Sequence, residues 1–256
     1  MPAARQPVSA VIITLNAASQ LEPCLRALAF CDEIVVVDSG SSDGTPALAA
    51  RLGARVIHEA WRGFGPQKQF AVEQASHDWV LCVDADERVS DALRAGIEAA
   101  LAAPAACAYR CARCNRFLGR YLRHGEGYPD WSLRLFDRRQ ARWSADAVHE
   151  KVIAAGPVAT LAGDLMHDSA ESLDGYLAKQ NRYTTLAAAA AIARGKRAGA
   201  AQVLLSPLVR FLKFYFFRLG FLDGLPGLVH ILIGCGNSFA KYAKMLGLQG
   251  SGPGER

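Results

Sequence analysis

The residues Trp79 to Glu87 read WVLCVDADE, an apolar run that ends abruptly in acids. The first part, Trp79 to Val83, has the length and composition of a buried strand. It is followed at once by Asp84, Asp86 and Glu87. Carboxylates this close in the sequence repel one another, so either a cation compensates them or the stretch faces water.

Similar apolar runs alternate with helical patterns before this stretch. Strands are predicted at Val8–Thr14, Glu33–Val37 and Arg55–His58, and helices at Ala18–Phe30, Pro46–Leu52 and Gln67–Ala75. Apolar strands separated by helices predict βαβ units, with a parallel sheet covered by helices on both faces. The chain is therefore expected to have an α/β fold, in which ligands bind at the carboxyl ends of the strands. Asp38, Asp84 and Asp86 all fall at such ends.

The second half of the chain is less regular and then becomes helical. Residues Cys107 to Glu150 contain strand-like segments at Ala108–Phe117 and Ser132–Phe136, and the pattern after Gly156 is helical. We predict a catalytic α/β domain over residues 1–155 and a helical region over residues 156–256.

The composition is that of a globular protein and limits its partners. Hydrophobic residues make up 51% of the 256 residues, which excludes a disordered chain, and the net charge of +5 allows an anionic partner without selecting one. The sequence has neither a stacking platform nor a recognition helix, so a nucleic-acid partner is not expected. Seven cysteines, together with an N-terminal apolar run too short for a signal peptide, favour a reducing, cytosolic location.

The segment Val203–Leu222 is amphipathic in a way that suits a membrane surface. Arg210, Lys213 and Arg218 span an arc of about 140° on one face of a helix. Three phenylalanines lie mostly on the other side: Phe214, Phe217 and Phe221. Residues 196–244 hold seven Lys or Arg against a single acid, Asp223, a balance that suits anionic lipid.

We therefore predict a helix that lies in the plane of the membrane interface. The alternative is a buried helix whose cations extend to solvent. A spanning helix is not expected, because the uncharged stretch Gly224–Ala240 is shorter than the roughly 20 residues that a span needs.

The pair Asp84-x-Asp86 suggests a metal site. In an extended chain, residues two apart point the same way, so both carboxylates can meet one cation. Carboxylate oxygens suit Mg²⁺ or Mn²⁺, which also bind phosphates, and such an ion would compensate the repulsion between the acids. The alternative is a solvated acidic turn.

A second candidate site follows the strand at Glu33–Val37, in the sequence VDSGSSDGT (Val37–Thr45). The carboxylate of Asp38 can accept hydrogen bonds from a base or a sugar, and the small residues let a ligand approach the backbone. The helix after Thr45 offers its positive end. The alternative is an ordinary βα turn in which Asp43 caps the helix.

The spacing Cys107-x3-Cys111-x2-Cys114 matches a [4Fe–4S] cluster motif. The context ACAYRCARCNRF alternates like a strand, however, whereas a cluster needs a loop that wraps the metal. We expect these cysteines to be small residues of a strand, and we keep a cluster-binding redox enzyme as a distant alternative.

Three segments together resemble one known family. They are IITLN (Ile12–Asn16), EIVVVDSGSSDGT (Glu33–Thr45) and WVLCVDADE (Trp79–Glu87), and in this order they resemble family 2 glycosyltransferases of the GT-A fold. Five further segments are similar to the lipopolysaccharide core β-1,4-glucosyltransferase branch: WRGFGPQKQFA (Trp61–Ala71), GYPDWSLRLFDRR (Gly127–Arg139), VHE (Val148–Glu150), KQNRY (Lys179–Tyr183) and GFLDG (Gly220–Gly224).

The resemblance implies a Rossmann-like, mostly parallel sheet with flanking helices, followed by a membrane-associated helical region. It implies an inverting enzyme, peripheral on the cytoplasmic face of the membrane, that moves glucose from UDP-glucose to a heptose of the inner core. The alternative acceptor is a polyprenyl phosphate.

The resemblance also implies roles for residues on the donor side. Thr14 and Asn16 would lie under the nucleotide, and Asp38 would receive the uracil or ribose. Asp84 and Asp86 would hold Mg²⁺ or Mn²⁺, with Asp86 nearest the metal. Lys68 would lie near the diphosphate, or else be an exposed helix lysine.

On the acceptor side, the family needs a carboxylate that takes the proton of the attacking hydroxyl. The resemblance favours Glu150 for this role, with Asp130 as the rival. His149 is a metal ligand, orients Glu150 or is a packed polar side chain. Four cations are candidates for binding acceptor phosphates: Arg134, Arg138, Lys179 and Arg182.

Overall fold

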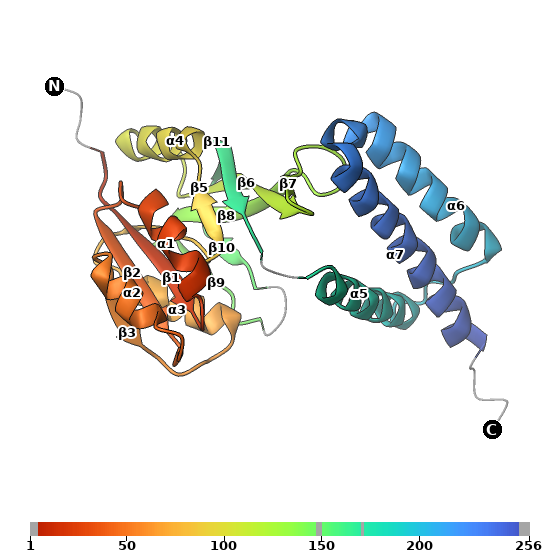
Figure 1. Cartoon of the computed structure of the whole chain (residues 1–256), viewed down its shortest axis with the longest axis horizontal. Helices are drawn as coiled ribbons and strands as arrows, with labels where there is room; N and C mark the ends of the chain where they lie inside the picture. The colour runs from red at the N-terminus through yellow and green to blue at the C-terminus, as the bar shows by residue number, and fades with distance from the viewer. Residues whose placement is uncertain (1–4, 147–149, 170–171, 251–256) are drawn as a thin grey trace. The chain divides into compact units, whose positions relative to one another are not determined.

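The computed structural model describes residues 5–146, 150–169 and 172–250 (Figure 1). The chain forms two compact units. The sheet unit comprises Met1–Cys114 and Asp130–Asp168, and the helical unit comprises Asn115–Pro129 and Ser169–Arg256. Each unit is described by itself.

The first half of the sheet unit alternates between strands and helices as expected. Its elements are β1 (Val8–Thr14), α1 (Ala18–Ala27), β2 (Glu33–Asp38), α2 (Thr45–Arg51), β3 (Arg55–His58), α3 (Phe64–Gln74) and β4 (Trp79–Cys82). The strands form a parallel sheet in the order β3-β2-β1-β4, with Ile12 paired to Val36 and Val11 to Cys82. The predicted α/β architecture is confirmed.

The second half of the unit extends this sheet with antiparallel strands. Its elements are β5 (Glu87–Val89), α4 (Asp91–Ala102), β6 (Ala108–Phe117), β8 (Asp130–Asp137), β9 (Ala141–Trp143), β10 (Val152–Ala154) and β11 (Val158–His167). The sheet continues from β4 through β8, β6 and β11 to β5, whereas β9 and β10 pair with each other. The strand-like segments expected around Ala108–Phe117 and Ser132–Phe136 are thus confirmed as β6 and β8.

The sheet curls, because β4 and β5 are neighbours in the sequence but four strand positions apart in the sheet. In a flat sheet these positions would be separated by about 19 Å, at about 4.8 Å for each strand. The short connection Val83–Asp86 contains a tight turn and cannot bridge that distance. The far edge of the sheet is therefore brought back toward the carboxyl end of β4.

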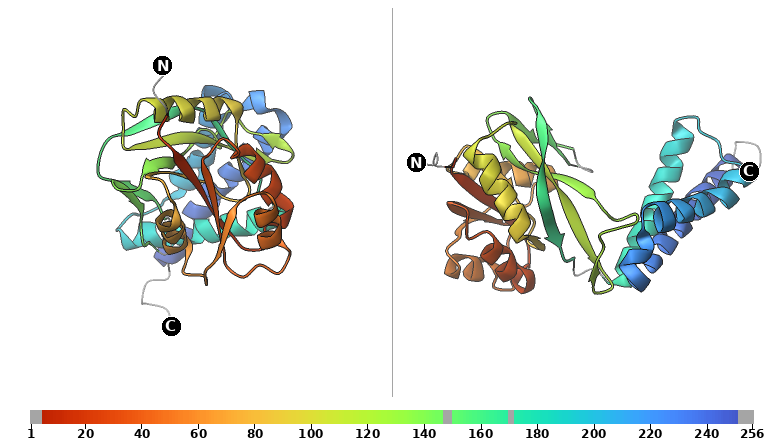
Figure 2. Two further views of the ribbon diagram at one scale, coloured as in Figure 1. Left: turned by 90° about the vertical axis from the view of Figure 1, so that its left-hand side faces the viewer. Right: turned by 90° about the horizontal axis from the view of Figure 1, so that it is seen from above.

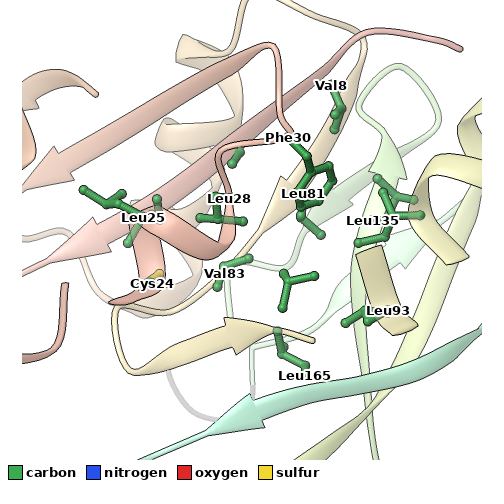
Figure 3. Packing of buried hydrophobic residues seen from close by; sticks show 14 of the residues in the cluster. Val8, Cys24, Leu25, Leu28, Phe30, Leu81, Val83, Leu93, Leu135 and Leu165 are labelled. Atoms are coloured by element: carbon green, nitrogen blue, oxygen red, sulfur yellow. The ribbon is translucent and has the colours of Figure 1, made fainter. Parts of the chain in front are cut away.

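Two apolar clusters hold the unit together, one on each face of the sheet. Helices α1, α2 and α4 contribute to the first cluster, in which Leu28, Leu81, Leu93 and Leu135 are almost completely buried (Figure 3). Helix α3 and strand β9 contribute to the second cluster, around Phe136. Alternate residues of β1 face opposite clusters, as the period of two in a strand requires.

The helical unit consists of α5 (Leu173–Ala193), α6 (Ala200–Phe211), a π-helical segment (Leu212–Phe217), a 3₁₀ segment (Gly220–Asp223) and α7 (Gly224–Gly250). Helix α7 packs against both α5 and α6 (Figures 1 and 2). The segment 115–129, which contains the last residues of β6 and the short strand β7 (Arg120–Tyr121), belongs to this unit, although the rest of β6 and all of β8 belong to the sheet unit.

The buried carboxylate of Asp223 ties the segment 115–129 to the helices. It accepts hydrogen bonds from the backbone amides of Arg123 and His124 and contacts the His124 ring at 3.1 Å. Arg210 of α6 forms an ion pair with Glu126. The predicted boundary after residue 155 therefore differs from the structure, where the sheet unit ends after β11 and the helical unit includes an earlier segment.

The predicted single helix over Val203–Leu222 is interrupted. The helical turns stop after Phe217, and Leu219 adopts a left-handed conformation with φ of 55°. The ring of Phe214 lies against Arg210 and Lys213, so its predicted place opposite the cations is wrong; residues four apart share one face of a helix. By length and composition alone, Ala200–Phe217 could cross a membrane.

The three closely spaced cysteines are buried: Cys107 lies in the bend just before β6, and Cys111 and Cys114 lie within this strand. Cys107, Cys111 and Cys114 are each at most 5% exposed, and Cys111 belongs to the first apolar cluster. The positions of Cys111 and Cys114 support their interpretation as small strand residues, whereas Cys107 is a buried residue of the preceding connection.

Glu33 provides a pH-dependent contribution to stability. Burial acts to raise the pKa of Glu33, but hydrogen bonds from Ser9, Ser76 and Arg55 outweigh burial and lower that pKa to about 2. Glu33→Gln is expected to reduce the free energy of unfolding by about 3 kcal/mol at neutral pH. The stabilisation is fully present above the ordinary pKa of 4.5 and is lost as the pH falls toward 2.

Urea unfolding of both proteins across this pH range measures the difference. Glu22→Gln is the control, because Glu22 forms only an exposed pair with Arg26 and should change stability by less than about 0.5 kcal/mol. A Glu33→Gln deficit that does not shrink in acid would show that the Glu33 charge is not the cause.

Candidate active site

The acids after β4 lie in a tight turn. The amide of Glu87 donates to the Asp84 carbonyl at 2.9 Å, and the Glu87 carboxylate accepts from the Asp84 amide at 3.0 Å. The segment is therefore not extended, and the argument that Asp84 and Asp86 point the same way is wrong. The turn instead directs Asp84 and Glu87 toward a shared cation, Arg134, and Asp86 toward His167.

Asp84 lies between two cations. Its Oδ1 is 3.2 Å from Lys68 Nζ of α3, and its Oδ2 is 2.9 Å from an Arg134 nitrogen of β8. Burial acts to raise the pKa of Asp84, but Arg134 and Lys68 hold that pKa well below its ordinary value. Asp84 is consequently a permanent negative charge at the carboxyl end of β4.

Glu87 is completely buried beneath the turn. Its carboxylate is 2.6 Å from Arg134 and 3.6 Å from Arg113 of β6. Burial raises the pKa of Glu87 and the charge of Asp84 raises it further, whereas Arg134 opposes this rise. Arg134 is thus the main group that favours the ionised form of Glu87 against the effect of burial.

Arg134 is 5% exposed and is held by the two acids. Within the described part of the chain, its Nε atom is buried without a hydrogen-bond partner. The expected role at acceptor phosphates gains no support from this buried position. Arg138 instead donates to the carbonyls of Val72 and Ala75 near the end of α3.

Lys179 and Arg182, the other cations expected at the acceptor, lie on exposed turns of α5 in the helical unit. Their part in acceptor binding remains a prediction.

Asp86 meets a histidine that the sequence did not reveal as a site residue. Its Oδ2 is 3.1 Å from Nε2 of His167, the last residue of β11. His167 pairs with Glu87 across the β5–β11 ladder, and the Asp168 amide donates to the Asp86 carbonyl at 2.9 Å. The expectation of a helical pattern directly after Gly156 is wrong, because Val158–His167 forms β11. Neither this strand nor its pairing with β5 was predicted from the sequence.

Glu150 is linked to the acid turn by Lys68, which forms ion pairs with both Glu150 and Asp84. The Lys68 Nζ is 3.3 Å from Glu150 Oε1 and 4.8 Å from the centre of the Trp143 ring. Lys68 is 9% exposed, so the alternative of an exposed helix lysine is wrong. Gly65 in the first turn of α3 lets this helix lie close to Ser144 and Glu150, because a Cβ at position 65 would collide with the Ser144 carbonyl. His149, also a candidate, lies outside the described residues.

Asp130, the rival base, begins β8 and is held by Arg113. The Arg113 guanidinium donates to one oxygen of Asp130 at 2.9 and 2.7 Å. Because Arg113 also faces Glu87, Asp130 belongs to the same network of charges as the acid turn.

The loop after β2 is organised around Asp38, which is 2% exposed. The Asp38 carboxylate accepts hydrogen bonds from the Thr14 hydroxyl at 2.8 Å and from the amides of Gly40 and Ser41. These bonds lower the pKa of Asp38 against the effect of burial. In the structure Asp38 shapes the loop, and its contact with a nucleotide remains a prediction.

Asn16 connects β1 to the same loop. It adopts a left-handed conformation with φ of 52°, and its side-chain oxygen accepts from the Ser42 amide at 2.9 Å. Asp43 accepts from the amides of Ala18 and Thr45, at the starts of α1 and α2, which agrees with its expected capping role. The ends of β1 and β2 therefore form one rigid rim beside the acid turn.

The charges of this network suit a divalent cation. Four carboxylates, those of Asp84, Glu87, Asp130 and Glu150, pair with three cations, those of Lys68, Arg113 and Arg134, whereas Asp86 pairs with His167. The described residues contain no group of three or more His, Cys, Asp or Glu side chains arranged to hold a metal. Asp86 and His167 together fit an ion that takes its remaining ligands from water and a diphosphate.

The sequence of this sheet unit matches a known protein family. The model described as "Glycosyl transferase family 2" matches residues 9–154, more than half of the chain. The chain belongs to glycosyl transferase family 2. The family 2 match covers β1 to β10, including the acid turn and Glu150.

Two relatives extend the similarity over nearly the whole chain. The lipopolysaccharide core biosynthesis glycosyltransferase LpsC of Rhizobium meliloti (strain 1021) is 36% identical, covering 93% of this chain and 92% of the relative. An uncharacterised glycosyltransferase of Rickettsia bellii (strain RML369-C) is 29% identical, covering 93% of this chain and 85% of the relative.

A solved structure agrees with the glycosyltransferase fold. The mannosyltransferase PcManGT of Pyrobaculum calidifontis, in complex with GDP-Man and Mn²⁺, superposes with a TM-score of 0.53. It is 21% identical and covers 96% of this chain and 88% of its own.

Arg134→Met tests the electrostatic arrangement of this family 2 site. The substitution keeps the approximate volume but leaves the buried Glu87 without its nearest cation and removes one of the two cations that hold Asp84. The free energy of unfolding is expected to fall by about 3–5 kcal/mol at neutral pH. The deficit should be smaller in mild acid, because an unpaired Glu87 has a raised folded-state pKa and takes up a proton.

Chemical denaturation at two pH values measures both effects. Arg26→Met removes an exposed pair and serves as the matched control, with an expected change below about 0.5 kcal/mol. A loss for Arg134→Met no larger than that of the control would contradict the proposed dependence of the acid turn on Arg134.

Proposed function

We propose that this family 2 glycosyltransferase moves a hexose to the core of lipopolysaccharide, with UDP-glucose as donor and an inner-core heptose as acceptor. The observation that carries the site is the pairing of Asp86 with His167 at the carboxyl end of β4. The similarity to LpsC over nearly the whole chain supports the lipopolysaccharide pathway. The choice of UDP-glucose and heptose rests on the resemblance of the sequence segments.

Asp86 and His167 would hold Mg²⁺ or Mn²⁺ together with the donor diphosphate, and the Mn²⁺ in the PcManGT complex supports this proposal. When bound, the ion neutralises the charge that grows on the departing nucleoside diphosphate. Lys68 adds a positive group above Asp84 on the same side of the site. Thr14, Asn16 and Asp38 would hold the nucleoside through the loop rim.

Glu150 is our candidate for the catalytic base. The acceptor oxygen attacks the anomeric carbon, the bond from that carbon to the diphosphate oxygen breaks, and the acceptor proton passes to the Glu150 carboxylate. One displacement of this kind inverts the anomeric configuration. The contact of Glu150 with Lys68, which also holds Asp84, supports Glu150 over Asp130, which Arg113 holds through two hydrogen bonds.

The helical unit would provide acceptor and membrane contacts at the cytoplasmic face. Lys179 and Arg182 on α5 are candidates for acceptor phosphates, and α6 presents apolar side chains to the surroundings. A polyprenyl phosphate is the second candidate acceptor, because this apolar surface would suit a lipid-linked substrate as well. Partition of the labelled product between water and organic solvent distinguishes a core oligosaccharide from a polyprenyl product.

Calorimetric titration tests the donor site. UDP-glucose is expected to bind in the presence of Mn²⁺ or Mg²⁺, more tightly than UDP-galactose or GDP-mannose, and Asp86→Ala should weaken this binding at least about tenfold. His167→Ala should show a similar loss. Glu98→Ala, an exposed change on α4, is the control and should bind as the wild type does.

If the donor binds equally well with and without the metal, the proposal that Asp86 holds a metal ion is contradicted. Failure of all three sugar nucleotides to bind to the folded protein would contradict the assignment of the donor site.

Glu150→Gln separates binding from chemistry. The variant should bind the donor within about threefold of wild type but lose a factor of about 10² to 10⁴ in kcat, since the amide cannot accept the acceptor proton. Asp130→Asn should keep most of its activity. The opposite pattern in a transfer assay with purified core acceptor would assign the base to Asp130.

A further inference from the structure

The helical unit contains a cationic cavity that the proposed chemistry does not use. The cavity has a volume of about 300 Å³ and lies where the connection between α5 and α6 meets the last turns of α7. Its lining combines polar and cationic side chains with an apolar floor: Ala191, Lys196, Arg197, Gln202, Lys241, Tyr242 and Met245.

Three positive charges converge on this cavity without an acid in its lining. Lys196 and Arg197 come from the α5–α6 connection, and Lys241 comes from α7, where its ammonium lies 5.0 Å from the centre of the Tyr242 ring. In the described part of the helical unit the acids are engaged elsewhere or lie at the start of α5. Glu126 pairs with Arg210, Asp223 with His124, and Asp174 is in the first turn of α5.

The cavity is held in shape by contacts at its edges. The side chain of Gln249 accepts from the Ala198 amide at 2.6 Å and donates to the Ala198 carbonyl at 3.0 Å, which fixes the connection against α7. Lys244 donates to the carbonyl of Asn181 and the hydroxyls of Thr184 and Thr185, which fixes α7 against α5. The cavity thus has a lining of three cationic side chains and no acid, which favours an anionic ligand.

The cavity is continuous in sequence with an exposed apolar helix face. Gln202 in the first turn of α6 lines the cavity, and the following turns of the same helix expose Leu204, Leu205, Leu208 and Val209, each at least 53% exposed. No residue of α6 is buried. A ligand that complements both parts has an anionic head and an apolar body.

We propose that this cavity binds the phosphate of an anionic phospholipid headgroup, with the acyl chains of the lipid along the exposed face of α6. Basic pockets between helices recognise phosphate headgroups, and cations near an anionic surface each contribute to binding. The inference rests on the proposed membrane association and names the lipid class that this association selects.

Vesicle flotation with the full chain tests the proposal. Wild-type protein is compared with a triple variant, Lys196→Gln, Arg197→Gln and Lys241→Gln, on phosphatidylcholine vesicles with and without phosphatidylglycerol. The triple variant should lose about a hundredfold in apparent affinity for vesicles that contain phosphatidylglycerol. Its binding to pure phosphatidylcholine, which depends on α6, should be unchanged.

A matched control removes three exposed cations from the sheet unit: Arg26→Gln, Arg51→Gln and Arg94→Gln. The net charge falls by the same amount, so a loss confined to the cavity variant supports a built site, whereas equal losses in both variants would show diffuse attraction and overturn it. A second triple variant, Lys196→Arg, Arg197→Lys and Lys241→Arg, keeps the three positive charges and should bind these vesicles as the wild type does. Donor titration of every variant confirms that the donor site is intact.

Three further results would overturn the proposal. Unchanged binding of the cavity variant to phosphatidylglycerol would exclude the cavity as the headgroup site. Displacement of the protein from vesicles by millimolar inorganic phosphate, with tight binding of that phosphate alone, would assign the cavity to a free phosphate. If wild-type protein binds neither kind of vesicle, the membrane association itself fails, while the donor titration still reports on the glycosyltransferase site.

Discussion

The ion pairs that Arg134 forms with Asp84 and Glu87 are the constraint on which the sheet unit depends. A turn that carries three acids can be placed at the end of a buried strand only if cations from other elements lie beneath it. Arg134 reaches the turn because β8 runs antiparallel beside β4, and Arg113 reaches it from β6. The antiparallel half of the sheet therefore provides the counter-charges that the parallel half requires.

This arrangement explains why the site has two kinds of acid. Asp84 and Glu87 are used by the protein itself, since cations of the sheet and of α3 hold them. Asp86 is directed away from these cations toward His167. The curl of the sheet makes this possible, because it returns β11 to the carboxyl end of β4. In the acidic turn, Asp84 and Glu87 thus stabilise the fold through their ion pairs, whereas Asp86 is our candidate for contact with a ligand.

Local patterns in the sequence were sufficient to predict β1 to β4 and their helices, because strands buried in a parallel sheet are continuous apolar runs. The antiparallel strands β6 and β8 were predicted from strand-like segments that mix apolar and polar residues. The resemblance to family 2 grouped Asp84, Asp86, Lys68 and Glu150; in the structure Lys68 pairs with Asp84 and Glu150, whereas Asp86 pairs with His167. The role of Arg134 and the place of His167 were not predictable. Both depend on which strands become neighbours, and pairing between distant strands leaves no periodic signal in either strand.

The interrupted connectivity of the helical unit has a consequence for modularity. The segment 115–129 leaves the sheet unit between β6 and β8 and is fastened to Asp223 and Arg210, about a hundred positions later in the chain. The C-terminal helices alone are therefore not a transferable module. A chimera that grafts them onto another catalytic half must also carry this segment, or the carboxylate of Asp223 will be buried without donors. Exchange between relatives would have to occur at two places in the gene at once.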